Sequence, residues 1–155
     1  MNYRLLAKDE KTLYEGVIEK HKNNFCNAGI DYMTSCVYAL YMKDKGFPLG
    51  FMVLEKKTLD ELCVHLIFIF GTFRRYGAGS SLLKVIKRDF KERIIYGFCP
   101  IENEEAIKFF IANDVKFLSR DRKSQVTPNK YRTNLYVNEA TNSIQFFLRC
   151  DYDND

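Results

Sequence analysis

A glycine-containing loop in the middle of the chain has the residue types of a phosphate-binding site. The apolar run Leu66–Phe70 has the composition of a buried strand, and the loop Arg74–Gly79, which reads RRYGAG, follows it. A helical pattern begins at Ser80. Backbone N–H groups converge at a helix N-terminus, and the helix dipole adds partial positive charge there. Two guanidinium groups beside such a terminus predict an anion site, with a phosphate-bearing ligand as its occupant.

Two familiar phosphate loops fail on particular residues of this stretch. A P-loop needs a lysine after its last glycine, whereas serine follows Gly79 here. A dinucleotide-binding loop needs a third glycine, at the position that Leu82 occupies. A third pattern, R-x-x-G-x-G at the end of a long strand, is matched by Arg74, Gly77 and Gly79.

The strand and helix around this loop belong to a longer series of elements. Hydrophobic periodicity predicts strands at 3–7, 36–42, 48–55, 61–70, 94–99, 115–118, 131–137 and 144–150, and helices at 9–24, 80–92 and 102–113. Asp9 is the expected N-cap of the first helix, and 120–130 is expected to be a charged loop. This order predicts an α/β (mixed α+β) fold, in which one central, mostly antiparallel mixed sheet of about six or seven strands has helices on both faces. The nearly continuous apolar character of 61–70 predicts burial on both faces.

Length and charge fit one globular domain with an anionic ligand. A chain of 155 residues is expected to form one domain over residues 1–150, followed by a short acidic tail at 151–155. The net charge is +4, a surplus too small and too dispersed to predict nucleic-acid binding. The basic side chains of the predicted helix at 80–92 are the only such candidate, and a solubilising role is the simpler interpretation.

The cysteines and histidines argue against disulfide and metal frameworks. The five cysteines include no C-x-x-C pair, and there are only two histidines. No metal site is therefore expected, and reduced cysteines favour the cytoplasm. The N-terminus lacks the apolar core of a signal peptide, and no apolar run is long enough to span a membrane.

Together, the loop, its context and the element order resemble the GNAT superfamily of N-acetyltransferases. In that family this loop binds the pyrophosphate of acetyl-coenzyme A. A second family pattern, N-x-x-A-x-x-x-Y in the helix after the next strand, is matched by Asn103 and Ala106, with Phe110 at the tyrosine position. The resemblance covers roughly residues 1–150 in architecture and 61–118 in motif.

The resemblance implies which residues bind acetyl-coenzyme A. Loop amides and arginines would hold the pyrophosphate, and backbone groups at the end of the central strand would contact the pantetheine arm and polarise the acetyl carbonyl. The implied cofactor-binding residues are Ile67, Phe68, Ile69, Arg74, Arg75, Tyr76, Gly77, Ala78, Gly79, Ser80, Asn103 and Phe110.

The general base is expected on the central strand, where Glu61, Cys63, His65 and Ile67 alternate and should share one face. The glutamate that serves as base in some family members falls by spacing on Cys63, which is unsuitable. Histidine readily exchanges protons near neutral pH, and a glutamate can act through water. Either His65 or Glu61 is therefore expected to assist deprotonation of the amine.

The general acid departs from the family pattern, because Phe110 cannot donate a proton. Tyr76, Tyr96 or water could replace it, and Cys63 or Cys99 would have to act as nucleophile if an acyl-enzyme formed. The implied activity is transfer of an acetyl (acyl) group from acetyl-coenzyme A to a primary amine by direct attack in a ternary complex.

The acceptor is expected to be a small molecule, peptide or protein rather than a polyamine, since the variable stretch 24–35 is aromatic and has one acid. The alternative function, motivated by Phe110, is a catalytically weak or inactive module that binds acyl-coenzyme A.

Overall fold

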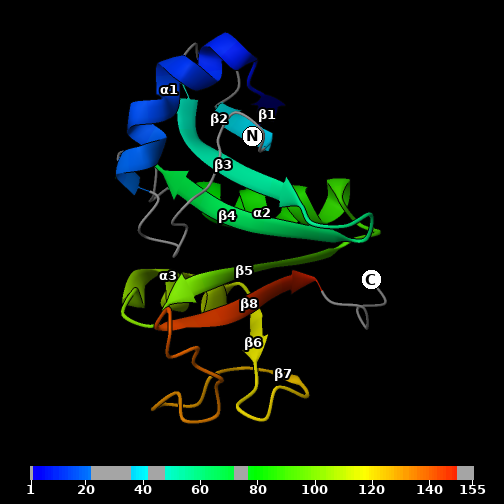
Figure 1. Ribbon diagram of the computed structural model, residues 1–155, viewed down its shortest axis with the longest axis vertical. Helices are drawn as coiled ribbons and strands as arrows, with labels where there is room; N and C mark the ends of the chain where they lie inside the picture. Colours follow the sequence, from blue (N-terminus) through cyan, green and yellow to red (C-terminus); the bar gives the residue numbers. More distant parts are fainter. Residues whose placement is uncertain (1, 22–35, 42–47, 72–76, 150–155) are drawn as a thin grey trace.

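In the computed structural model, the strands join into one eight-stranded sheet in the order β1-β2-β3-β4-β5-β8-β6-β7 (Figure 1). The structure describes residues 2–21, 36–41, 48–71 and 77–149. Its elements are β1 (Asn2–Leu5), α1 (Lys8–His21), β2 (Cys36–Tyr41), β3 (Pro48–Lys56), β4 (Glu61–Ile69), α2 (Ala78–Asp89), β5 (Ile94–Pro100), α3 (Glu104–Ala112), β6 (Lys116–Leu118), β7 (Gln125–Val126) and β8 (Ser143–Arg149). Neighbouring strands are antiparallel except β4 and β5, which run parallel and are connected through α2. The predicted mixed, mostly antiparallel sheet is confirmed.

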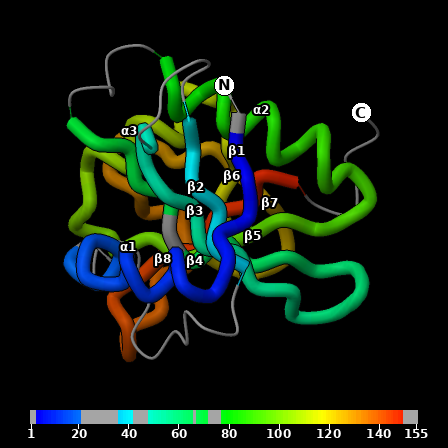
Figure 2. Tube along the Cα trace, turned by 90° about the horizontal axis from the view of Figure 1, so that it is seen from above, coloured from blue at the N-terminus to red at the C-terminus, as the bar shows by residue number. Residues whose placement is uncertain are grey.

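Helices cover the two faces of the sheet unequally. Figures 1 and 2 agree that α1 lies on one face, over β3, and that α2 and α3 lie on the other face. The ring of Tyr14 on α1 packs against Phe51 on β3, with ring centroids 5.0 Å apart. We call the side toward which Phe51 points the α1 face, and the other side the α2/α3 face.

The burial of strand side chains matches the positions of the helices. β3 is buried on both faces over most of its length, and β4 likewise has buried side chains on both faces, as its apolar run predicted. β5 and β8 alternate instead between buried and partly exposed side chains. Their buried members lie on the α2/α3 face, and none of the described helices lies over the other face of this half of the sheet (Figure 1).

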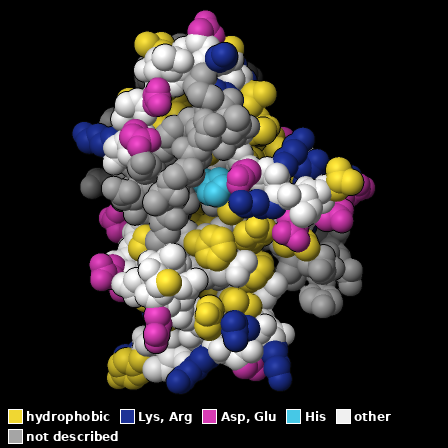
Figure 3. Space-filling view, in the orientation of Figure 1, with side chains coloured by type: hydrophobic (Ala, Val, Ile, Leu, Met, Phe, Trp, Pro, Cys, Tyr) yellow, Lys and Arg dark blue, Asp and Glu magenta, His cyan; other side chains and the backbone are white. Residues whose placement is uncertain are grey.

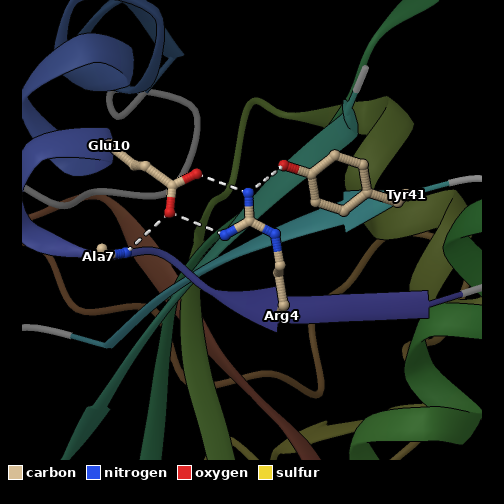
Figure 4. Close-up of polar contacts among 4 residues, drawn as sticks. All are labelled: Arg4, Ala7, Glu10 and Tyr41. Atoms are coloured by element: carbon tan, nitrogen blue, oxygen red, sulfur yellow. Dashed lines mark hydrogen bonds and ion pairs between the residues drawn. The ribbon is translucent and has the colours of Figure 1, made fainter. Parts of the chain in front are cut away.

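A hydrogen-bonded clip fixes where α1 begins. Arg4 on β1 makes two hydrogen bonds to the carboxylate of Glu10, at 2.8 and 2.5 Å, and a third to the Tyr41 hydroxyl at 3.1 Å (Figure 4). The same carboxylate accepts the Ala7 N–H at 3.2 Å. These bonds, first that from Arg4, lower the pKa of Glu10 to about 2. The prediction that Asp9 is the N-cap is wrong, because α1 begins at Lys8 and Glu10 satisfies the orphan donor instead.

The predicted strand at 131–137 is also wrong. This stretch has only one isolated bridge, between Ser119 and Leu135, and a second, between Asn138 and Ser143, lies just after it. Arg132 takes a positive φ of 58°, which a strand does not allow. Asparagine and threonine side chains of 129–134 bond to nearby backbone and to one another, and such local bonds compete with a ladder. A two-residue strand, β7, forms instead within the predicted loop 120–130, and the sheet has eight strands where about six or seven were expected.

Candidate functional site

The sheet opens between its two parallel strands. Backbone pairing of β4 with β5 runs from Glu61 and Ile94 to Val64 and Gly97, and stops there, although both strands continue. A Cβ on Gly97 would lie 2.6 Å from the Val64 carbonyl oxygen and 2.4 Å from the Phe146 ring. The last rung therefore needs glycine, and beyond it the strands diverge, as Figure 1 shows.

A β-bulge at His65, where the opening begins, reverses which face of the sheet alternate β4 side chains point to. Val53 on β3 pairs with Leu66, whereas the next residue, Leu54, pairs with Val64, so His65 is the extra residue. Directly paired side chains share a face, so Cys63 lies on the α1 face and Ile67 on the opposite one. The expectation that Glu61, Cys63, His65 and Ile67 share one face is therefore wrong for Ile67.

Beyond the bulge, β4 turns part of its backbone toward the opening. The Phe70 N–H bonds to the Leu49 carbonyl on β3 at 2.8 Å. Backbone groups alternate in direction along an antiparallel strand, so those of Ile67 and Ile69 point away from β3, toward the β5 side. At that level β5 no longer pairs with β4.

A cavity of about 500 Å³ occupies the α2/α3 face of this opening. Its walls come from the end of β4, the first turn of α2, and α3. The lining residues are Ile67, Phe68, Ile69, Gly79, Asn103, Glu105, Ala106, Lys108, Phe109 and Phe110. The volume is in the usual range for small-molecule and cofactor sites, and a mostly apolar wall with a few polar groups is typical of them.

The first turn of α2 adds backbone donors to one side of this cavity. Gly77 precedes the helix with a positive φ of 70° and provides no side-chain cap, and the first turn holds no acid. Within the described residues, the early N–H groups of α2 therefore have neither an N-cap side chain nor a first-turn carboxylate, which favours an anion there. A Cβ on Gly79 would lie 2.9 Å from the Phe109 ring, so glycine lets α2 and α3 approach closely. α3 differs, because the Asn103 side chain caps it by accepting the Ala106 N–H at 3.2 Å.

Half of the predicted cofactor-binding residues line this single cavity: Ile67, Phe68, Ile69, Gly79, Asn103 and Phe110. Gly77, Ala78 and Ser80 lie beside it at the start of α2. Arg74, Arg75 and Tyr76 lie outside the described residues. Of the other lining residues, Glu105, Lys108 and Phe109 were missed. All three lie between Asn103 and Phe110, and their helical spacing from Asn103 was the available signal.

On the α1 face, His65 has an acidic partner that the sequence did not indicate. His65 Nε2 lies 3.2 Å from Glu55 Oε1, and the histidine side chain is only 17% exposed. Glu55 also pairs with Lys57 at 2.7 Å. Hydrogen bonds from Lys57 and then from His65 lower the pKa of Glu55, so its carboxylate is charged at neutral pH. Glu55 lies on β3 directly opposite Cys63. From the sequence, only residues of β4 were considered as the base, so the acid on the neighbouring strand was missed.

The other predicted base, Glu61, lies at the opposite end of β4 from the opening. It pairs with Ile94 on the first rung of the parallel ladder, where the two strands are still joined. Its backbone carbonyl accepts the Lys57 N–H at 3.0 Å in the turn between β3 and β4. The structure therefore places His65, and not Glu61, at the level where the strands separate.

The candidate nucleophiles and proton donors differ in burial and in the pKa of their side chains. Cys63 is 2% exposed, and burial raises the pKa of its thiol to about 11. Cys99 is fully buried, and its thiol donates to the Pro100 carbonyl at 3.5 Å. Phe110 is stacked on Phe146 with ring centroids 4.3 Å apart and is 1% exposed. Tyr96 keeps a phenol whose pKa burial raises to about 12.

The described part of the chain shows neither a cluster of metal ligands nor a membrane-spanning helix. In the described ranges, no group of three or more histidine, cysteine or acidic side chains could hold a metal ion. No helix among the same residues is long and apolar enough to cross a membrane.

Comparisons by sequence and by structure give different results. Neither a protein-family model nor a curated protein matches the chain. Solved structures do match it over nearly its whole length. A Bacillus subtilis acetyltransferase in complex with CoA has a TM-score of 0.58 and 10% identity, covering 96% of this chain and 98% of its own.

Two further solved structures are similar to the chain. The ribosomal-protein-S18-alanine N-acetyltransferase from Escherichia coli has a TM-score of 0.59 and 13% identity over 99% of this chain and 97% of its own. An acetyltransferase from Thermus thermophilus has a TM-score of 0.61 and 12% identity over 95% and 96%. At such low identity, the similarity shows a shared fold and does not extend to substrates. With the opened parallel pair and the cavity beside it, these similarities establish that the chain has the fold of the GNAT acetyltransferase superfamily.

Proposed function

We propose that this protein is an N-acetyltransferase, which transfers an acetyl (acyl) group from acetyl-coenzyme A to a primary amine. The observation that carries the proposal is the opening of the β4–β5 ladder onto a cavity of about 500 Å³. The free thiols of Cys36, Cys63 and Cys99 support a cytoplasmic location.

The residues around the cavity fit acetyl-coenzyme A as co-substrate. The uncapped first turn of α2 offers N–H groups to a pyrophosphate, and Lys108 adds a cation at the cavity wall. Apolar side chains of β4 and α3 suit a pantetheine arm. The Ile67 N–H points toward the opening, where it would polarise a thioester carbonyl as a fixed donor.

His65 is the better candidate for the base, with Glu55 as its positioning partner. A neutral amine is needed for attack, and the base must lie within reach of the reacting nitrogen or of a bridging water. His65 lies at the bulge, at the level of the opening, and the Glu55 carboxylate would stabilise the imidazolium that forms. Among described residues, Tyr96 is the candidate proton donor to the leaving thiolate, with water as the alternative.

Direct attack by the amine is supported by the burial of both cysteines near the opening. An acyl-enzyme needs an accessible thiolate, whereas the Cys63 thiol has a pKa of about 11 and is 2% exposed. We therefore propose a ternary complex without a covalent intermediate.

Replacing Cys63 by alanine is expected to leave kcat/KM within about threefold of the original value, because the thiol takes no part in direct attack. Some stability should be lost, since a buried side chain is shortened. Steady-state kinetics, with the variant held well below its melting temperature, would measure this. A loss of about 100-fold or more would contradict direct attack and favour a cysteine nucleophile.

A second candidate function is a module that binds acyl-coenzyme A with little or no turnover. The burial and stacking of Phe110 favour it, because this wall of the cavity offers no proton donor where the family has tyrosine. Both functions predict binding of the co-substrate, so only turnover separates them.

Acetyl-coenzyme A is expected to raise the melting temperature. At 100 times Kd a ligand stabilises by roughly 2.7 kcal/mol, which corresponds to roughly 5–10 °C for a domain of this size. Two measurements test the proposal. The first is thermal unfolding with and without acetyl-coenzyme A, and the second is release of the coenzyme A thiol in the presence of each amine of a panel. Stabilisation without thiol release would favour the binding module, and the absence of both would reject a coenzyme A site.

A further inference from the structure

On the α1 face, strands β5 and β8, which no described helix covers, present aromatic side chains beside the opening. Tyr96 and Phe98 project from β5 on this face, and Phe147 on β8 lies directly opposite Tyr96. The Tyr96 and Phe98 rings pack edge to face with centroids 6.0 Å apart. Phe98 remains 38% exposed, which marks it as a large apolar side chain without full cover among the described residues. We call these three residues the aromatic platform.

The platform is continuous with the candidate base. Tyr96 pairs with Cys63, which in turn lies opposite Glu55, so one row of side chains crosses β8, β5, β4 and β3 on the α1 face. Figure 3 views this face and shows hydrophobic side chains gathered next to a histidine, an acid and a base. Phe98 follows Gly97, so it lies just beyond the last rung, where β5 has left β4.

Access to the opening differs between the two faces. On the α2/α3 face, α2 and α3 wall the cavity that we assign to the co-substrate. An acceptor that meets the thioester must therefore approach from the α1 face, where no helix within the described ranges covers β5 and β8 (Figure 1). Any body attached to the amine then lies against the aromatic platform.

The charges on this face do not suit a polycation. On the described strands, Glu55 and Glu61 lie on this face, and Glu55 already pairs with Lys57 and His65. Lys116 lies on the same face, opposite Phe147. A polyamine would need several carboxylates for its separate charges, and the aromatic surface offers them none.

We propose that the acceptor is a primary amine on an apolar, aromatic-bearing body, which binds by stacking on Tyr96, Phe98 and Phe147. The proposal rests on the acetyltransferase function above and specifies its acceptor class. Edge-to-face and offset stacking on exposed rings gives both affinity and orientation to such a body. The same chemistry could come from a small arylalkylamine or from a peptide with an aromatic residue near its N-terminus.

The test compares four acceptors: phenethylamine, a short peptide beginning Ala-Phe, ethylamine and spermidine. Phenethylamine or the peptide is expected to exceed ethylamine and spermidine at least tenfold in kcat/KM, and their ranking tells the small molecule from the peptide. Phe98→Ala should raise KM for the preferred aromatic acceptor about tenfold, with little change in KM for ethylamine or acetyl-coenzyme A. Leu59→Ala is the matched control, because Leu59 is 91% exposed in the β3–β4 turn, away from the platform.

Calorimetry with phenethylamine and coenzyme A-saturated protein gives a second readout that does not need turnover. Binding that Phe98→Ala weakens about tenfold supports the inference. Preference for spermidine, or an unchanged KM and Kd in Phe98→Ala, overturns the acceptor class while the acetyltransferase function stands. A stable dimer that loses its contact in Phe98→Ala also overturns it, because a second copy would then cover the platform. Failure of the function itself is separate, since neither stabilisation by acetyl-coenzyme A nor thiol release would then be seen.

Discussion

His65→Gln is expected to lower kcat/KM for acetyl transfer about 100-fold, the lower end of the range for losing a general base. His65 is the extra residue of the β4 bulge, so it lies where the β4–β5 ladder has just ended. Glutamine retains polarity and similar length but cannot take up a proton. KM for acetyl-coenzyme A should hardly change, because His65 is on the α1 face and the cavity is on the other. The pH dependence of kcat/KM, measured for both proteins, checks the assignment.

Substitutions at Glu55 and Glu61, alone and combined with His65→Gln, test this assignment more closely. Glu55→Gln should lose about tenfold, because the carboxylate acts through the imidazole. The double variant His65→Gln, Glu55→Gln should be no worse than His65→Gln alone, since coupled groups are not additive. Glu61→Gln is the matched control on the same strand and should remain within about threefold. If Glu61→Gln loses activity and His65→Gln does not, Glu61 is the base. An unchanged pH profile in the His65, Glu61 double variant would reject both.

Long periodic segments made most of this fold predictable. The stretch 61–70 reads as a doubly buried strand and the stretch after Gly79 as an amphipathic helix, and β4 and α2 are present with ends that differ by a few residues. Arg74, Gly77 and Gly79, with Asn103 and Ala106, pointed to a fold that the solved structures confirm. Those motifs also located the cavity, because Gly79 and Asn103 both line it.

The candidate base and its partner needed the pairing of strands. A bulge adds one residue relative to the neighbouring strand, so nothing within 61–70 alone marks His65 as the extra one. Glu55 is ten residues away in sequence but hydrogen-bonded to His65 across two strands. The aromatic platform was hidden for a similar reason. Alternation predicted a half-buried β5, but which face stays open depends on where α2 and α3 pack.

Gly50→Ala is expected to destabilise the protein by at least ~3 kcal/mol, beyond the usual cost of overpacking. A Cβ on Gly50 would lie 1.9 Å from the Phe68 carbonyl oxygen and 2.9 Å from the Ile69 Cα. Both are backbone atoms of the central strand, so no side-chain rotation relieves the clash. β3 and β4 would have to separate, although their ladder holds the centre of the sheet. Since domains are stable by about 5–15 kcal/mol, a loss of this size removes a large part of the total stability.

Gly16→Ala is the matched control for this prediction. Gly16 lies within α1, is exposed, and has nothing within 4 Å of an added Cβ. Alanine there should stabilise by up to ~1 kcal/mol through helix propensity alone. Urea unfolding of both variants separates a general effect of a methyl group from the clash at β4. A Gly50→Ala protein as stable as the original would mean that β3 and β4 do not pair in this register. The bulge at His65 depends on that register, so the assignment of His65 as the base would be contradicted as well.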